Sequence, residues 1–183
     1  MSTGEAAVAA GRQAFLSRFA WHAGHADVWR AFEDAHTLGA VVDALAAPWY
    51  DRGITAVAGI ESRGFLLGGS VAVRLGVGFH AIRKSGALFA GDKVAVESEP
   101  DYRGLRQRLA MRTSLSGDDN VLLVDDWAEK GAQALAARAL VTKAGARWGG
   151  VSIIVDQLPS KLRSHLGPVT ALVTADELGP ADG

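Results

Sequence analysis

Two adjacent carboxylates, Asp125 and Asp126, follow directly on an apolar run, Val121 to Val124. Neighbouring carboxylates at the end of a strand can accept hydrogen bonds from the vicinal hydroxyls of a sugar, or share a Mg²⁺ ion with them. Residues 127–133 contain a glycine and lead into a helical pattern. The N–H groups and dipole at a helix start favour a phosphate there. Val121 to Ala134 therefore predicts a strand, a loop and a helix start that bind a sugar phosphate.

A second group of polar residues follows another apolar run, Ile54 to Ile60. This group is Glu61, Ser62, Arg63 and Gly64, and a helical pattern comes after it. Ligands bind outside the carboxyl ends of the strands in an open parallel sheet. We therefore expect the two polar groups to lie at the same edge of one sheet.

Alternating strands and helices must position these residues. The two apolar runs lack a polar alternate, which is typical of parallel strands that are buried on both faces. Each run is followed by a helical pattern, at Gly64 to Leu75 and at Gln133 to Ala144. Further short β-type runs are Gly78 to Ile82, Leu105 to Met111, Val151 to Val155 and Val169 to Val173. This alternation predicts an α/β fold with a mainly parallel central sheet, right-handed crossovers and flanking helices.

Two regions differ from this alternation. Gly4 to Tyr50 has a mainly helical pattern and holds three of the five tryptophans. Ser85 to Arg103 contains glycines, mixed charge and Pro100 without a steady period, which predicts a long mobile loop. Long loops inside compact domains are usually functional, and many are lids. We expect a single domain over residues 1–183, with its core at about 54–175.

Composition excludes several classes of function. The net charge of −1 offers no basic excess for nucleic acid, and the 183 residues suit one domain. The lack of cysteine excludes disulfides, zinc–thiolate sites and cysteine nucleophiles. The N-terminus has no signal-peptide pattern, and no stretch approaches the roughly 18 apolar residues of a membrane span. We expect a soluble cytoplasmic protein that binds neither nucleic acid nor membrane.

Two motifs resemble a known family. VLLVDDWAEKGAQA resembles the phosphoribosyl-pyrophosphate (PRPP) signature of type I phosphoribosyltransferases, four apolar residues followed by DDxxxTGGT. AGIESRGFLLGGSVAVRLGVGFHAIRKSGAL resembles adenine phosphoribosyltransferases, which read GIESRGF, then a helix, then a strand ending in RK. The similarity covers about Val41 to Val155, with both motifs in the family's order. It implies the type I phosphoribosyltransferase fold with an N-terminal helical hood at about residues 1–50, and a homodimer.

The resemblance also implies where PRPP binds. Asp125 and Asp126 would hold the ribose hydroxyls, directly or with the Mg²⁺ that accompanies PRPP. Arg63 would face the pyrophosphate. The full set of residues implied to bind PRPP is Glu61, Ser62, Arg63, Gly64, Arg83, Lys84, Asp125, Asp126, Ala128, Glu129, Lys130, Gly131, Ala132 and Gln133.

The base and the catalytic loop are implied in the same way. Trp127 lies where the family has an apolar residue near the purine, so it either stacks on the base or packs in the core. Trp21 and Phe19 of the hood are further candidates for base contacts. In the loop, Asp101 before Tyr102 stands where the family has glutamate before tyrosine. It would act as a general acid toward the purine or order the closing loop.

The phosphate segment departs from the family pattern. Only Gly131 of TGGT is present, because Lys130, Ala132 and Gln133 occupy the other positions. Backbone N–H groups remain as phosphate ligands, and Lys130 either reaches the phosphate or points into solvent. The resemblance implies transfer of the phosphoribosyl group of PRPP to a purine-like base, adenine above all. Two alternatives stay open: a PRPP- or nucleotide-sensing regulator without turnover, and a transferase for an unusual base in a specialised pathway.

Overall fold

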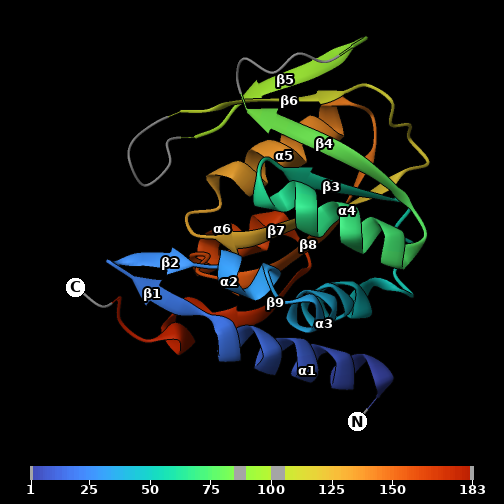
Figure 1. The fold of residues 1–183 in the computed structure, drawn as a ribbon. Coiled ribbons are helices and arrows are strands. Elements are labelled where there is room, and N and C mark those ends of the chain that lie inside the picture. Colours follow the sequence, from blue (N-terminus) through green and yellow to red (C-terminus); the bar gives the residue numbers. More distant parts are fainter. Residues whose placement is uncertain (1, 85–89, 100–105, 182–183) are drawn as a thin grey trace.

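The computed structural model describes residues 2–84, 90–99 and 106–181 (Figure 1). Among these residues, seven strands form one mixed sheet in the order β5-β6-β4-β3-β7-β8-β9. The five parallel strands are β3 (Ala56–Ile60), β4 (Gly78–Lys84), β7 (Asn120–Ala128), β8 (Arg147–Asp156) and β9 (Val169–Thr174). The α/β fold with a mainly parallel sheet, predicted from the alternation of elements, is confirmed.

Helices cover both faces of the sheet. One face packs against α1 (Thr3–Arg18), α3 (Ala35–Ala46) and α4 (Arg63–Leu75). The other face packs against α5 (Ala132–Lys143), with α6 (Ser160–Leu166) beside it. Leu122 and Leu123 are adjacent in β7 and enter opposite core layers, and each is at most 1% exposed. This two-sided burial explains why the strand is apolar throughout.

The N-terminal region is mainly helical, as expected, and also contains a hairpin. Between α1 and α2 (Trp29–Phe32), the strands β1 (Ala20–His22) and β2 (His25–Asp27) pair antiparallel. The 3₁₀ helix η1 (Ala47–Trp49) follows α3, and η2 (Ala175–Leu178) follows β9. Each hairpin strand has only three residues, too few to show an alternating pattern. Figure 1 shows this hairpin and the C-terminal segment at the same end of the molecule.

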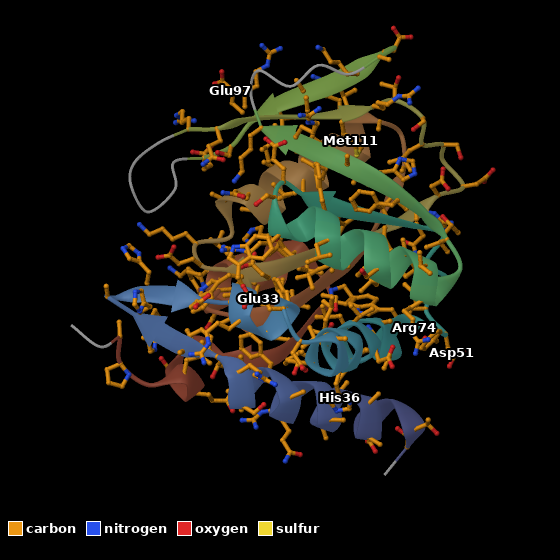
Figure 2. All side chains as sticks on the ribbon, viewed as in Figure 1. Glu33, His36, Asp51, Arg74, Glu97 and Met111 are labelled. Carbon is orange, nitrogen blue, oxygen red and sulfur yellow. The ribbon has the colours of Figure 1, made fainter. Side chains whose placement is uncertain are left out.

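The predicted loop over Ser85 to Arg103 is wrong in its middle. Residues 93–97 form β5 (Lys93–Glu97), which pairs antiparallel with β6 (Arg108–Arg112). Val94 and Val96 pack against the core layer that contains the fully buried Met111, labelled in Figure 2. This five-residue strand escaped notice because its pattern is short and lies among charged residues. Asp101, which the resemblance implies as the catalytic residue of the loop, and the adjacent Tyr102 lie outside the described residues.

Two further predictions about strands need correction. The run Leu105 to Met111 corresponds to β6, which is antiparallel to β4 and so lies outside the parallel set. The apolar run from Val121 does not end the strand at Val124, because β7 continues to Ala128 through pairing with β8. Within the described part of the chain, no helix is long and apolar enough to cross a membrane.

Candidate active site

A cavity of about 1170 Å³ opens at the carboxyl edge of β3 and β7. Its wall combines the end of β3, the acidic end of β7, the start of α5, the β1–β2 hairpin and the C-terminal segment. Most of the residues implied to bind PRPP line it. They are Glu61, Ser62, Arg63, Lys84, Asp125, Asp126, Ala128, Glu129, Lys130, Gly131, Ala132 and Gln133.

The acidic pair lies in the last part of β7 rather than after it. Asp126 is 5% exposed, and its Oδ2 lies 2.6 Å from Nε of Arg63 at the start of α4. Asp125 Oδ1 accepts a hydrogen bond from the Asp126 N–H, at 3.0 Å. Burial raises the pKa of Asp125 well above its ordinary value, and the neighbouring Asp126 raises it further. A neutral or positive ligand group beside this pair would therefore be favoured.

Glycines bring the start of α4 directly onto the strands. A Cβ on Gly59 would lie 2.0 Å from the carbonyl oxygen of Gly64, so no other residue fits there without a shift. A Cβ on Gly64 would lie 3.1 Å from Asp125 Oδ1. The peptide between Glu61 and Ser62 is cis. Close packing thus places Arg63 beside the carboxylates of β7.

Glu61 ties the turn after β3 to the end of β4. Its Oε1 accepts a hydrogen bond from the Lys84 N–H at 3.0 Å, and its Oε2 lies 3.3 Å from Arg83 Nε. The carboxylate of Glu61 therefore holds the basic strand end in place. Lys84 lines the cavity, whereas Arg83 and Gly64 are not among the described residues that line it.

The loop between β7 and α5 is short and is shaped by Gly131. This residue caps α5 with a φ of 70° and a ψ of 0°, a left-handed conformation that suits glycine. A Cβ there would also lie 2.9 Å from Cδ2 of Leu158. Among the described side chains, none makes a capping hydrogen bond to the first turn of α5. Its N–H groups are consequently available to an anion.

Two tryptophans form the aromatic end of the cavity. Trp127 and Trp21 both line it, and their rings meet edge to face with centroids 6.2 Å apart. The Nε1 groups donate to Gln157 Oε1 at 2.9 Å and to the Leu178 carbonyl at 3.1 Å, respectively. Phe19 packs against Trp21 with ring centroids 5.4 Å apart, and it is not among the described residues that line the cavity.

Several lining residues were missed by sequence reasoning. Gln157 follows β8, and Asp176, Gly179 and Pro180 belong to the segment after β9. The rule that ligands lie beyond the carboxyl ends of parallel strands would have found Gln157. The same rule points to the segment after β9, although its place beside the hairpin depends on tertiary packing.

Comparison with known proteins identifies relatives over most of the chain, although no family model matches it. Adenine phosphoribosyltransferase of Thermosynechococcus vestitus is 40% identical over 81% of this chain and 87% of its own length. The crystal structure of adenine phosphoribosyltransferase from Rhodothermus marinus matches with a TM-score of 0.78 and 27% identity, covering 90% of this chain and 98% of that one.

A second solved structure matches at higher sequence identity. The enzyme from Giardia lamblia, complexed with 9-deazaadenine, is 32% identical with a TM-score of 0.72. The match covers 82% of this chain and 86% of that one. The chain belongs to the adenine phosphoribosyltransferase family of the type I phosphoribosyltransferases.

Proposed function

We propose that this protein transfers the phosphoribosyl group of PRPP to adenine and releases pyrophosphate. The observation that carries this proposal is a single cavity lined by Asp125 and Asp126, by Arg63, which is paired with Asp126, and by the uncapped start of α5. One cavity then offers a partner for each part of PRPP: carboxylates for ribose, cations for pyrophosphate and N–H groups for the 5′-phosphate.

The reaction asks mainly for positioning and charge stabilisation. A ring nitrogen of adenine attacks C1 of PRPP while the bond from C1 to the pyrophosphate oxygen breaks. Positive charge develops on the sugar, and the carboxylates of Asp125 and Asp126 stabilise it. Negative charge develops on the departing pyrophosphate, where Arg63 and Lys84 stabilise it.

Binding of PRPP requires an exchange of partners at Arg63. In the free protein its Nε is paired with Asp126 at 2.6 Å. Pyrophosphate would draw the guanidinium away, and the ribose hydroxyls would then donate to the carboxylate. Each ion in the pair thereby gains a ligand partner and neither is left buried and unpaired.

The acidic pair also fits a Mg²⁺ ion that arrives with PRPP. Mg²⁺ in proteins is usually held by one or two carboxylates together with substrate phosphates and water. Asp125 and Asp126 supply such carboxylates. Asp126 Oδ2 is buried and ion-paired with Arg63 but accepts no hydrogen bond from the described residues. When bound, the ion would neutralise charge on the pyrophosphate.

The departures from TGGT are compatible with turnover. Backbone N–H groups at Gly131 to Gln133 need no hydroxyl side chain to bind a phosphate, and Lys130 adds a cation at the cavity wall. A regulator without turnover is not favoured, since the matched relatives are named adenine phosphoribosyltransferases. Asp101 remains our candidate for the general acid of the loop.

Assembly and location form part of the same proposal. Leu66 and Val73 of α4 are seven residues apart, share one helix face, and are 37% and 80% exposed. We expect this face to bury itself in a homodimer. The proposed substrates, PRPP and adenine, are metabolites of the cell interior, which supports a cytoplasmic location for the protein. Sedimentation should give a dimer for the parent protein and a monomer for Val73→Glu; a monomeric parent would contradict the dimer.

A base panel tests the proposed reaction. The purified protein is incubated with PRPP, Mg²⁺ and adenine, hypoxanthine, guanine, xanthine or a pyrimidine, and pyrophosphate release is recorded. We expect release with adenine well above that with any other base. PRPP binding without release for any base would instead indicate the sensing regulator. Release with a different base alone would indicate a transferase of other specificity.

A further inference from the structure

Gln157 is held at the rim of the cavity by two contacts to the end of β7. It directly follows β8, and its backbone N–H donates to the Ala128 carbonyl at 2.9 Å. Its side-chain Oε1 accepts the hydrogen bond from Trp127 Nε1, also at 2.9 Å. The side chain lines the cavity and is exposed to it. These two contacts fix its position, and it has no role in the reaction proposed above.

The contact with Trp127 also sets the orientation of the amide. An indole N–H only donates, so its partner in Gln157 must be the amide oxygen. The amide nitrogen, Nε2, consequently lies on the other branch of the group with two N–H donors. Among the described residues, no group accepts a hydrogen bond from it.

The surroundings of this amide are aromatic. Trp127 and Trp21 present their rings to the cavity, and both indole N–H groups are already engaged by Gln157 and by the Leu178 carbonyl. The two rings can therefore offer a planar ligand stacking and edge contacts but no hydrogen bond from nitrogen. Gln157 Nε2 supplies a donor directly beside them.

We propose that Gln157 recognises the base: its Nε2 donates a hydrogen bond to a ring nitrogen of the purine that packs against Trp127. This inference rests on the proposed function, because it takes the aromatic end of the cavity as the base site. Adenine suits such a donor, since its ring nitrogens N1, N3 and N7 accept hydrogen bonds when N9 carries the ribose. A donor at this position selects bases with an unprotonated ring nitrogen facing it.

Two substitutions separate donation to the base from support of Trp127. Gln157→Glu keeps an oxygen for the Trp127 N–H but replaces the amide donor by an acceptor. Gln157→Leu removes both functions at similar size. Gln13→Glu adds the same charge on the exposed surface of α1, outside the cavity, and serves as the matched control.

The measurement is equilibrium binding of AMP and its 1-deaza, 3-deaza and 7-deaza analogues by calorimetry. Each analogue replaces one ring nitrogen by C–H, and the comparison within one variant cancels effects on the phosphate. We expect one of the three analogues to bind the parent about tenfold more weakly than AMP, the loss of roughly one hydrogen bond. In both Gln157 variants that ratio should fall to within about twofold, while Gln13→Glu keeps it.

The outcomes distinguish this inference from the proposed function. The inference is overturned if the pattern of analogue affinities is the same in the parent and in both Gln157 variants. It is also overturned if these variants weaken PRPP and AMP equally with that pattern unchanged, which would indicate a phosphate contact. Binding needs no turnover, so an inactive parent that shows the expected ratios would contradict the proposed reaction and leave base recognition supported.

Discussion

At the scale of single residues, the site combines groups that would be costly to bury alone. Asp125 and Asp126 are neighbours in one strand, and only Arg63 is paired with them in the described structure. The two carboxylates repel each other when both are ionised, and a sugar with hydroxyl groups, or a Mg²⁺ ion, would relieve this repulsion. The arrangement suits ligand binding better than stability of the free protein.

Asp125→Asn should therefore stabilise the free protein at neutral and higher pH. Burial, followed by the charge of Asp126, raises the pKa of Asp125 above its ordinary value. The folded state then holds a proton that the unfolded state has lost, so the parent loses stability as the pH rises through this interval. The variant lacks this loss. Thermal unfolding at pH 5 and pH 8 should show a gain for the variant that grows with pH.

Asp126→Asn is the matched substitution, and we expect it to destabilise the protein because Arg63 loses its charged partner. Both variants should bind PRPP about 10- to 100-fold more weakly, since a charge-assisted hydrogen bond contributes about 1.5–3 kcal/mol. Identical pH dependence of unfolding in the parent and in Asp125→Asn would contradict the account of the acidic pair.

At the scale of elements, the phosphate loop depends on one backbone conformation. Gly131→Ala should destabilise the protein by about 1–2 kcal/mol, because a left-handed residue with a side chain is strained. The added Cβ also meets Leu158 at 2.9 Å. Chemical denaturation measures the loss, and PRPP affinity should fall with it.

Gly39→Ala provides the control for this prediction. Gly39 lies inside α3, where an added Cβ meets nothing within 4 Å, so alanine should stabilise by about 0.5–1 kcal/mol. If both substitutions shift stability by the same amount in the same direction, the conformation of Gly131 is not what holds the loop.

Sequence patterns predicted the parallel strands and their helices because long apolar runs and helical periods are strong signals. The strand β5 and the β1–β2 hairpin were missed, since strands of five and three residues carry little periodicity. The polar ends of β3 and β7, which were predicted to share one edge of the sheet, both line the cavity. Gln157 lies just after β8, where the rule on carboxyl strand ends points, but one neutral side chain gives little signal there. The exact place of the segment after β9 depends on tertiary contacts such as the hydrogen bond from Trp21.

At the scale of the whole molecule, the first helix, α1, is in contact with the segment after β9. The carboxylate of Glu177 in η2 forms an ion pair with the guanidinium of Arg12 in α1, and it also accepts hydrogen bonds from Thr174. The indole of Trp21 bonds to the next residue, Leu178. These contacts place the segment after β9 against the hood, where it closes one side of the cavity.

Glu177→Gln should loosen this closure in a pH-dependent way. Hydrogen bonds from Thr174, followed by the contact with Arg12, lower the pKa of Glu177 to about 2. The carboxylate therefore contributes stability above about pH 4.5 that is lost as the pH falls toward 2. Because both side chains are exposed, we expect the substitution to lower the free energy of unfolding at pH 7 by about 1 kcal/mol at most.

A double-mutant cycle with Arg12→Gln measures the coupling between the two side chains. The difference between the parent and Glu177→Gln should shrink when unfolding is measured at pH 3 instead of pH 7. A difference that stays constant over this range would show that the carboxylate charge of Glu177 does not hold the segment.

Formation of AMP from PRPP and adenine tests the central claim most directly. It is measured with Mg²⁺ present for the parent protein and for the double variant Asp125→Asn, Asp126→Asn. The account predicts AMP and pyrophosphate in equal amounts from the parent, and a fall in kcat/KM of at least about 100-fold in the variant. A parent that forms no AMP, or a double variant as active as the parent, would contradict it.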